Sequence, residues 1–180
     1  MFKLNLGCGP FPIHDQHLEV MGDLSEWILV DWYVKDDRIA NWDATNLPIQ
    51  DKSCDVIYAS HLLEHIPHVD NIKVLTHWYN KLHSGGKLIL NVPDLEWACR
   101  RLLQYEDGRL LDGYYNTFSG EHGLISIFYG SQSHDGEYHK SGYTKTFINR
   151  LLKDVGFIDI QIEQIEEAHD MGCLIVTATK

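Results

Sequence analysis

The chain alternates short apolar runs with segments of helical periodicity, and polar loops separate the two. The runs "KLNL", "ILVDW", "CDVIYAS" and "KLILNV" are continuous or nearly so, as is typical of strands that are covered on both faces. Weaker patterns in "RIANWDA", "IDIQIEQ" and "CLIVTAT" indicate three further strands. We predict strands in residues 3–6, 26–33, 38–44, 54–60, 87–94, 158–164 and 173–179.

Two longer segments carry apolar residues at helical spacing and end at glycine. In the first segment, the apolar face is formed by Ile72, Leu75, Tyr79 and Leu82, followed by Gly85 and Gly86. In the second segment, the apolar face is formed by Phe147, Leu151 and Val155, followed by Gly156. Strands that alternate with helices predict an α/β protein in which helices cover both faces of a mostly parallel sheet.

In a parallel α/β sheet, ligands bind beyond the carboxyl ends of the strands. The residues just after the predicted strands are therefore candidates for a binding site: Gly7 to Gly9, Asp31, Asp43, Ser60, His61, Pro93 and Asp94. The segment from about 99 to 142 is aromatic and weakly periodic, and we expect it to form a cap over the sheet edge. With 180 residues, the chain fits a single domain, residues 1–180, that contains this cap.

The composition narrows the function. Fifteen Lys and Arg against 26 Asp and Glu give a formal charge of −11, so we expect neither nucleic acid nor an anionic membrane as a partner. The four cysteines are far apart and form no C-x-x-C pair, which favours a reducing, cytoplasmic location. The sequence has no leader-like start and no apolar run near the ~18 residues of a membrane span.

The stretch "LNLGCGP" places two glycines directly after the first strand, where backbone must turn or approach a ligand closely. A dinucleotide-binding site would have a third glycine and a helix that starts at once. Pro10 and Pro12 occupy that position instead, so binding of a pyrophosphate has little support. Asp31 ends the second strand, where a carboxylate can accept hydrogen bonds from both ribose hydroxyls.

Five motifs in order, "LNLGCGP", "ILVDW", "WDATNLP", "CDVIYASHLLEHI" and "LHSGGKLILNVPD", closely resemble the class I S-adenosylmethionine-dependent methyltransferases. In particular, the chain resembles small predicted methyltransferases with an N-terminal "LNLGCG". The resemblance is specific over residues 3–96 and looser after that. It implies a Rossmann-like fold with a seven-stranded, mostly parallel sheet whose last strand is antiparallel, and S-adenosylmethionine as cofactor, released as S-adenosylhomocysteine.

The resemblance also implies roles for individual residues. The methionine portion of the cofactor would lie against the glycine loop, which contains Asn5, Gly7, Cys8 and Gly9. The nucleoside would be held by Asp31 at the ribose hydroxyls, Trp32 against the adenine, Asp43 at the adenine amino group and the backbone amide of Ala44. Ser60 and His61 would lie beneath the sulfonium. The loop 10–25 departs from the family pattern because it replaces the usual first helix.

The motif "HLLEHIPH" allows two interpretations. His61, Glu64, His65 and His68 have helical spacing, and "HLLEH" resembles the E-x-x-E-H metal cluster of a family that methylates the ends of small RNAs. Leu-Glu-His at this position is also widespread in class I methyltransferases without a metal. We predict no metal ion, with His61 and His65 lining the site and Glu64 facing a helix N-terminus or a cap.

Methyl transfer from a sulfonium is an in-line displacement that depends mainly on positioning, and a general base is needed only for an O–H or N–H nucleophile. The candidate catalytic residues are His61, His65 and Asp94, although Asp94 fits an N-cap equally well. His139 and Tyr143 are candidates for substrate contact, and His139 can also serve as a base. The aromatic residues expected to pack the cap are Tyr114, Tyr115, Phe118, Phe128 and Tyr129.

Our interpretation of the sequence is a methyltransferase that acts on an unidentified small-molecule or sugar acceptor, with its oligomeric state open. Two alternatives remain: a protein of the same fold that binds the cofactor without methyl transfer, and a nicotinamide-dependent oxidoreductase. The first alternative exists because nothing in the second half of the sequence is diagnostic of catalysis.

Overall fold

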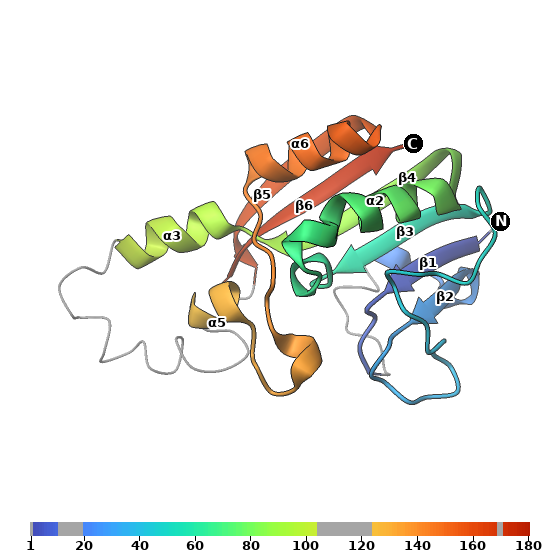
Figure 1. Cartoon of the computed structure of the whole chain (residues 1–180), viewed down its shortest axis with the longest axis horizontal. Coiled ribbons are helices and arrows are strands. Elements are labelled where there is room, and N and C mark those ends of the chain that lie inside the picture. The colour runs from blue at the N-terminus through green and yellow to red at the C-terminus, as the bar shows by residue number, and fades with distance from the viewer. Residues whose placement is uncertain (1, 11–19, 104–123, 169–170) are drawn as a thin grey trace.

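A six-stranded sheet forms the centre of the protein (Figure 1). The computed structural model describes residues 2–10, 20–103, 124–168 and 171–180. The strands are β1 (Phe2–Leu6), β2 (Trp27–Val30), β3 (Cys54–Ser60), β4 (Leu82–Pro93), β5 (Ile158–Ala168) and β6 (Met171–Thr179). Their order across the sheet is β2-β1-β3-β4-β6-β5.

The direction of the strands confirms the predicted sheet. β2, β1, β3 and β4 are mutually parallel, and β6 runs antiparallel to both of its neighbours, β4 and β5. The last strand along the chain is therefore the antiparallel one, as the family resemblance implied. Because β1 to β4 are parallel, their carboxyl ends lie at the same edge of the sheet, and the residues that follow them can form one site.

The strand predicted at residues 38–44 is not formed, so the described sheet has six strands rather than seven. Only one bridge, between Val30 and Ala40, joins this segment to β2. The polar groups around it are used in turns instead: the Trp42 amide donates to the Ala40 carbonyl, and the Asn41 side chain donates to the carbonyls of Asp31 and Trp32. A backbone that folds back on itself in this way cannot continue a ladder.

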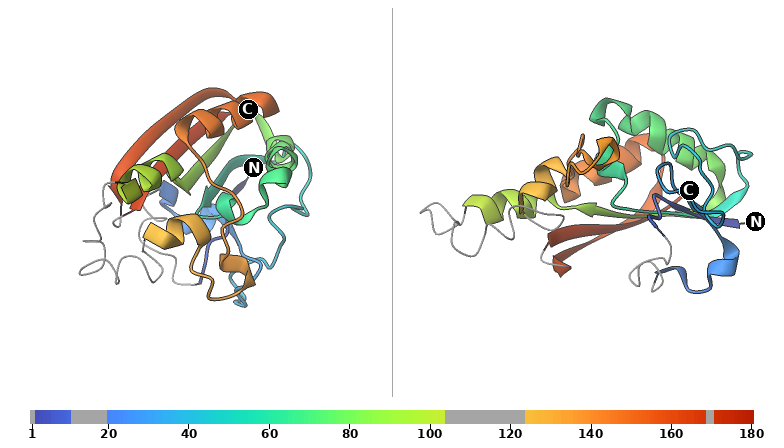
Figure 2. Two further views of the ribbon diagram at one scale, coloured as in Figure 1. Left: turned by 60° about the vertical axis from the view of Figure 1, so that its left-hand side comes forward. Right: turned by 90° about the horizontal axis from the view of Figure 1, so that it is seen from below.

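The two long helices cover one face of the sheet. α2 (Asn71–Lys81) follows β3, and α6 (Lys145–Val155) precedes β5. Figure 2 shows both helices on the same side, with the 3-10 helix η1 (Leu24–Glu26) on the other. Within the described part of the chain, the expected covering of both faces by long helices is thus seen on one face. None of the described helices is long and apolar enough to cross a membrane.

The two long helices end in different ways. α6 begins at the N-cap Thr144 and ends at Gly156, whose φ of +113° matches the predicted glycine stop. α2 ends at Lys81, earlier than Gly85, because β4 already begins at Leu82. The ammonium of Lys180 donates to the carbonyls of Tyr79, Asn80 and Leu82, so the last residue of the chain satisfies the end of α2.

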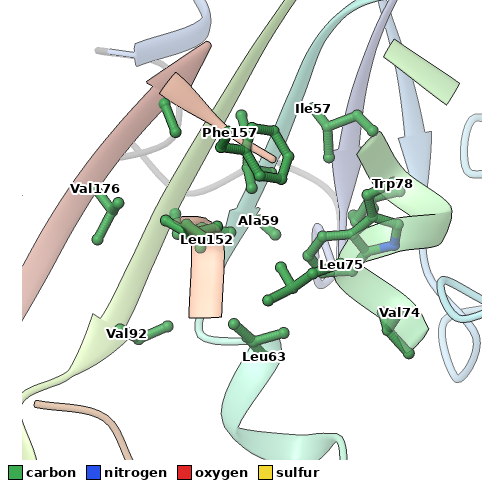
Figure 3. Close-up of a cluster of buried hydrophobic side chains, with 14 of the residues drawn as sticks. Ile57, Ala59, Leu63, Val74, Leu75, Trp78, Val92, Leu152, Phe157 and Val176 are labelled. Atoms are coloured by element: carbon green, nitrogen blue, oxygen red, sulfur yellow. The ribbon is translucent and has the colours of Figure 1, made fainter. Parts of the chain in front are cut away.

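The buried stripe of α2 differs by one position from the prediction. Ile72 is exposed, and the buried residues of the helix are Asn71, Val74, Leu75, Trp78 and Lys81. The large core on this side of the sheet joins α2, α6 and the strands (Figure 3). Trp78 lies at its centre beside Ile57 and Leu75, and is fully buried. Burial of such an aromatic side chain contributes about 3 kcal/mol to stability.

A smaller cluster covers the opposite face near β1 and β2. It consists of Cys8, Met21, Leu29, Ile39 and Tyr58, with Leu24, Trp27, Val34 and Ile89 packed against it. Loop residues rather than a long helix bury this face in the described residues. Met21 and Leu24, which precede β2 in the sequence, contribute to this cover.

Two helices extend beyond the carboxyl edge of the sheet, in the region expected to form a cap. α3 (Leu95–Leu103) packs against α5 (Leu124–Tyr129) through Ala98 and Ile127. Trp97 and Phe128 border this contact, whereas Tyr129 is exposed. The predicted cap residues Tyr114, Tyr115 and Phe118 lie outside the described residues.

Replacement of Trp78 tests the connection between α2 and the loop after residue 40. The Trp78 indole N–H donates to the Ala44 carbonyl at 2.7 Å. We expect Trp78→Phe to lower the free energy of unfolding by about 1–3 kcal/mol, because the ring is mostly retained but the carbonyl loses its donor. Denaturant unfolding measures this change. Trp32→Phe, at an exposed tryptophan, is the control and should change stability by less than about 0.5 kcal/mol.

Candidate cofactor and catalytic site

The glycine loop turns sharply at the end of β1. Gly7 and Gly9 have φ values of +67° and +70°, a region that favours glycine. The amides of Gly7 and Cys8 both donate to the Val30 carbonyl, which fixes the loop against the end of β2. A Cβ on Gly7 would lie 3.0 Å from the Leu62 side chain, whereas no described atom lies within 4 Å of one on Gly9. Among the residues that the structure describes, none fills the space beside the Gly9 backbone.

Asp31 connects the glycine loop to the loop that follows β2. Its Oδ2 accepts from the Gly9 amide at 3.0 Å, and its Oδ1 accepts from the amides of Tyr33 and Val34. A carboxylate has about four acceptor positions. Three backbone amides thus hold the side chain in place and leave acceptor capacity for a ligand at the carboxyl edge of the sheet.

Three further candidates follow the same edge. Trp32 is 56% exposed beside Asp31, so its ring is available to a ligand. Asp43 is exposed, and its Oδ1 accepts from both the amide and the hydroxyl of Thr45. The Ala44 carbonyl is held by Trp78. Within the described residues, neither the Asp43 Oδ2 nor the Ala44 amide forms a hydrogen bond, so both can contact a ligand.

Asn5 and Cys8 are more enclosed than the sequence suggested. Asn5 is fully buried in β1, where its Nδ2 lies 3.2 Å from the Met21 sulfur. The Cys8 thiol points to the Gly9 carbonyl at 3.4 Å, and burial raises its pKa to about 12. Both side chains support the loop from the side of the smaller core. Only the Cys8 backbone lies in the loop itself.

Ser60 is the last residue of β3 and His61 follows it, so both lie at the same edge of the sheet as the glycine loop and Asp31. Ser60 is buried and hydrogen-bonded with the Tyr58 hydroxyl. His61 has a φ of +49°, which is uncommon for a residue other than glycine, asparagine or aspartate. Its amide donates to the Asn91 carbonyl of β4, so the neighbouring strand holds this turn. Such strained residues are frequent at functional sites.

Glu64 is buried in η2 (Leu63–His65), and its carboxylate lies near His139 of the region 99–142 that we expected to act as a cap. Its Oε1 lies 3.2 Å from Nδ1 of His61. Burial alone would lower the pKa of the His61 imidazole, but its contacts with Cys173 and Glu64 raise it to about 10. Burial alone would raise the pKa of the Glu64 carboxyl, but His61, His65 and His139 together lower it. Both directions favour a charged imidazole beside a charged carboxylate.

His65 and His139 stand side by side next to this pair. Their ring centroids are 4.8 Å apart at an interplanar angle of 74°. Burial lowers the pKa of His139 below its ordinary value, although the neighbouring Glu64 carboxylate and the hydrogen bond with the Ile127 carbonyl act in the opposite direction. The fold thus brings together His61, Glu64 and His65 from the motif and His139 from 74 positions further along the chain.

Asp94 occupies the position of an N-cap. Its Oδ1 accepts from the Glu96 amide at 2.9 Å in the first turn of α3, and its Oδ2 accepts from the Gln164 side chain. The residue is 1% exposed. Both oxygens therefore have partners within the protein, and the geometry supports the structural one of the two roles considered for Asp94.

Tyr143 anchors the segment that carries His139. It is fully buried, and its hydroxyl donates to the Leu63 carbonyl at 3.0 Å and lies 3.2 Å from Oδ1 of Asn71. The amides of Lys140 and Ser141 both donate to the Glu64 carbonyl, and the Ser141 hydroxyl donates to the Ile66 carbonyl. The structure supports anchoring rather than substrate contact for Tyr143.

Sequence reasoning did not identify several residues that position the site. Asn71 holds Tyr143, Trp78 holds Ala44, and Ser141 holds Ile66. Their side chains act across 34 to 75 sequence positions. A polar residue on the apolar face of α2, such as Asn71, was the one signal in the sequence that could have indicated a buried partner.

The sheet order, the glycine loop after β1 and the acidic residue after β2 together define a Rossmann-like protein of the methyltransferase class. Residues 9–162 match the family described as a methyltransferase domain. The chain therefore belongs to the methyltransferase-domain family. No curated protein matches the sequence.

Solved structures show the same fold at low sequence identity. The 1,6-didemethyltoxoflavin-N1-methyltransferase of Burkholderia thailandensis, bound to its named substrate and S-adenosylhomocysteine, matches with a TM-score of 0.64, 14% identity and coverage of 99% of this chain and 70% of that chain. A SAM-dependent methyltransferase of Archaeoglobus fulgidus matches with a TM-score of 0.63 and 18% identity, over 99% of this chain and 85% of that chain. A SAM-dependent methyltransferase of Thermotoga maritima, described as a possible histamine N-methyltransferase, matches with a TM-score of 0.61 and 17% identity, over 99% of this chain and 82% of that chain.

Tyr143→Phe tests the anchoring role. We expect this change to lower the free energy of unfolding by about 1–2 kcal/mol, because the Leu63 carbonyl and the Asn71 side chain lose a buried partner. The measurement is denaturant unfolding of the variant beside Tyr129→Phe, which removes a hydroxyl from an exposed tyrosine. Equal stability of the two variants would show that the Tyr143 hydroxyl does not hold this segment.

Proposed function

We propose that this protein is an S-adenosylmethionine-dependent methyltransferase that methylates a small-molecule or sugar acceptor. The observation that carries the proposal is the contact of the Gly9 amide with Asp31, which joins the loops after β1 and β2 beside open space. The family assignment supports methyl transfer. The acceptor class rests on the acidic charge of the chain and on the cap region at the carboxyl edge, and it remains part of the proposal.

The residues at the sheet edge fit an adenosine with an amino acid tail. The tail lies along the Gly7 to Gly9 backbone, where a Cβ on Gly9 would have no described atom within 4 Å. Asp31 accepts from the ribose hydroxyls through the capacity that the three amides leave. The exposed ring of Trp32 lies against the adenine, and Asp43 with the Ala44 amide contacts its edge. The glycine loop has no third glycine, and Pro10 and Pro12 follow Gly9 in the sequence, which disfavours the pyrophosphate of a nicotinamide cofactor.

S-adenosylmethionine supplies an electrophilic methyl group, which an acceptor takes with its lone pair while the C–S bonding electrons remain on sulfur. The protein's part is to hold the two reactants in line and to exclude water. Ser60 and His61 lie at the end of β3, next to the glycine loop through Leu62, and form the floor of this region. His61 is paired with Glu64, so it donates hydrogen bonds rather than accepting a proton.

Where the acceptor carries an O–H or N–H, His65 and His139 are the better placed bases as long as no metal ion occupies their free ring nitrogens. Their rings adjoin Glu64, and the low pKa of His139 keeps its imidazole neutral and able to accept a proton. Asp94 is a weaker candidate because its two oxygens already bind Glu96 and Gln164. Calorimetric titration with S-adenosylhomocysteine and with NAD separates the proposed cofactor from the oxidoreductase alternative. An acceptor screen that follows release of S-adenosylhomocysteine separates a methyltransferase from a protein that only binds the cofactor.

Gly9→Val tests the position of the cofactor. Gly85 is a matched control, because it also has a positive φ, +83°, and no described atom within 4 Å of the place that a Cβ would take. It lies near the start of β4, at the opposite end of the strands from the glycine loop. Both variants should lose about 1–2 kcal/mol of stability through backbone strain. Only Gly9→Val should weaken binding of S-adenosylhomocysteine, by about 100-fold or more, measured by calorimetry. Equal affinities in the two variants would remove the cofactor from the glycine loop.

Asp31→Asn tests the ribose contact. The amide cannot accept from both Gly9 and a ribose hydroxyl at the former Oδ2, so we expect affinity for S-adenosylhomocysteine to fall by about 10- to 100-fold. Asp37→Asn removes the same charge from an exposed neighbour in the same loop and should leave affinity within about twofold. Circular dichroism of both variants checks the fold. Unchanged binding by Asp31→Asn would contradict the assignment of the ribose to this carboxylate.

A further inference from the structure

We propose that Glu64, His65 and His139 form a binding site for a divalent transition-metal ion. A carboxylate oxygen of Glu64 and one ring nitrogen of each histidine all lie within 4.8 Å of one another. A tetrahedral site with metal–ligand bonds of about 2.1 Å separates its donors by about 3.4 Å, so side-chain movements of about 1 Å would close this cluster around an ion. The sequence alone led us to predict no metal, because Leu-Glu-His at this position is also widespread in class I methyltransferases without a metal.

The two histidines are oriented as metal ligands usually are. Nδ1 of His65 lies 3.2 Å from the Tyr138 carbonyl, and Nδ1 of His139 lies 2.9 Å from the Ile127 carbonyl. A carbonyl oxygen only accepts hydrogen bonds, so each Nδ1 carries the proton. Nε2 of each ring therefore presents its lone pair, and the Nδ1 contact fixes the direction of the ring.

Glu64 provides a second, independent observation. The residue is 1% exposed, and neither carboxylate oxygen accepts a hydrogen bond from the residues that the structure describes. Its one close polar contact there is the 3.2 Å approach of His61 to Oε1. A buried carboxylate without hydrogen bonds is costly, and coordination of a cation is one of the few arrangements that compensate it.

The backbone makes the cluster rigid enough to select an ion. The Glu64 carbonyl accepts from the amides of Lys140 and Ser141, so the segment carrying His139 is fastened to the residue that supplies the carboxylate. In Figure 1 this segment, between α5 and α6, passes the loop that follows β3. The three ligands thus come from two chain segments that are held together by main-chain hydrogen bonds.

The donor set indicates the kind of ion. Two imidazole nitrogens and one carboxylate oxygen suit Zn²⁺, Fe²⁺, Co²⁺ or Mn²⁺, whereas Mg²⁺ and Ca²⁺ prefer oxygen ligands throughout. Three protein ligands leave further coordination positions open to water or to an oxygen of the methyl acceptor. The last point rests on the proposed function, because it requires the acceptor to lie at this edge of the sheet. The binding of the ion itself does not.

Cobalt is the probe for the test, because Co²⁺ bound by histidine and carboxylate absorbs visible light. Untagged protein is treated with a chelator, freed of it and titrated with Co²⁺, and Zn²⁺ is then added to displace the cobalt. We expect saturation at one Co²⁺ per chain, displacement by Zn²⁺, and no displacement by Mg²⁺ at the same concentration. Absence of saturable binding in the millimolar range would overturn the proposal and leave Glu64 and His61 as a buried ion pair.

Three variants locate the ion. Glu64→Gln, His65→Gln and His139→Gln should each weaken Co²⁺ binding by more than about 100-fold, since loss of a residue that only orients a ligand already costs roughly 10- to 100-fold. His68→Gln, at an exposed histidine of the same motif, should bind normally. Circular dichroism checks each fold, and His139→Gln lies in a loop that is fastened elsewhere by Ser141 and Tyr143. Normal binding by folded His65→Gln and His139→Gln would overturn the assignment.

Titration with S-adenosylhomocysteine in the same samples keeps the two proposals separate. Metal binding without S-adenosylhomocysteine binding would contradict the proposed function and leave the metal site intact. Binding of S-adenosylhomocysteine without metal binding would contradict the metal site and leave the proposed function intact.

Discussion

The carboxylate of Asp31 is the interaction on which the candidate cofactor site depends. It accepts from the amides of Gly9, Tyr33 and Val34, and so it holds the loop after β1 at a fixed distance from the loop after β2. Parallel strands bring the two loops to one edge of the sheet, but they do not by themselves set the distance between them. The positive φ of Gly9 allows its amide to face the carboxylate, which is why a glycine and an acid are needed together.

A second set of contacts builds the other half of the site. The Tyr143 hydroxyl reaches the Leu63 carbonyl, and the amides of Lys140 and Ser141 reach the Glu64 carbonyl. These bonds give the Glu64 carbonyl of a short 3-10 turn its partners, and they add a second donor to the Leu63 carbonyl, which also accepts from the Ile66 amide. They also bring His139 against His65. The segment before α6 is therefore part of the site, and its residues 139–141 belong to the region 99–142 that we expected to act as a cap.

The fold was predictable from sequence where local pattern and tertiary structure agree. The continuous runs at β1 and β3 and the glycine stop of α6 were recognisable because each depends on neighbouring residues. The segment at residues 38–44 was predicted as a strand from its apolar residues, but the Asn41 side chain and the Trp42 amide form turns there instead. Side-chain bonds to backbone compete with sheet formation and leave little trace in hydrophobic periodicity.

At the candidate site, too, the sequence predicts what depends on local pattern and does not predict contacts between distant segments. Gly9 and Asp31 were found because loop positions after parallel strands follow a known pattern. Asp94 could be an N-cap or a base from sequence, and only its contacts with Glu96 and Gln164 distinguish the two. The approach of His139 to Glu64 depends on main-chain bonds between distant segments. No residue type or spacing in the chain encodes those bonds in a form that can be recognised locally.

The electrostatics of Glu64 connect the two halves of the site. A chain with a net charge of −11 has little reason to bury another carboxylate unless a specific cation compensates it. His61 supplies one such charge from the side of the cofactor, with a side chain that is 34% exposed. His65 and His139 direct Nδ1 to backbone carbonyls, and their rings add no positive charge in their neutral forms. Leu62 lies between this cluster and Gly7, and a Cβ at Gly7 would come within 3.0 Å of it. Any ion that draws Glu64 and His65 together must therefore act on residues 61–65 as a unit, and through Leu62 it reaches the backbone on which the cofactor is proposed to lie.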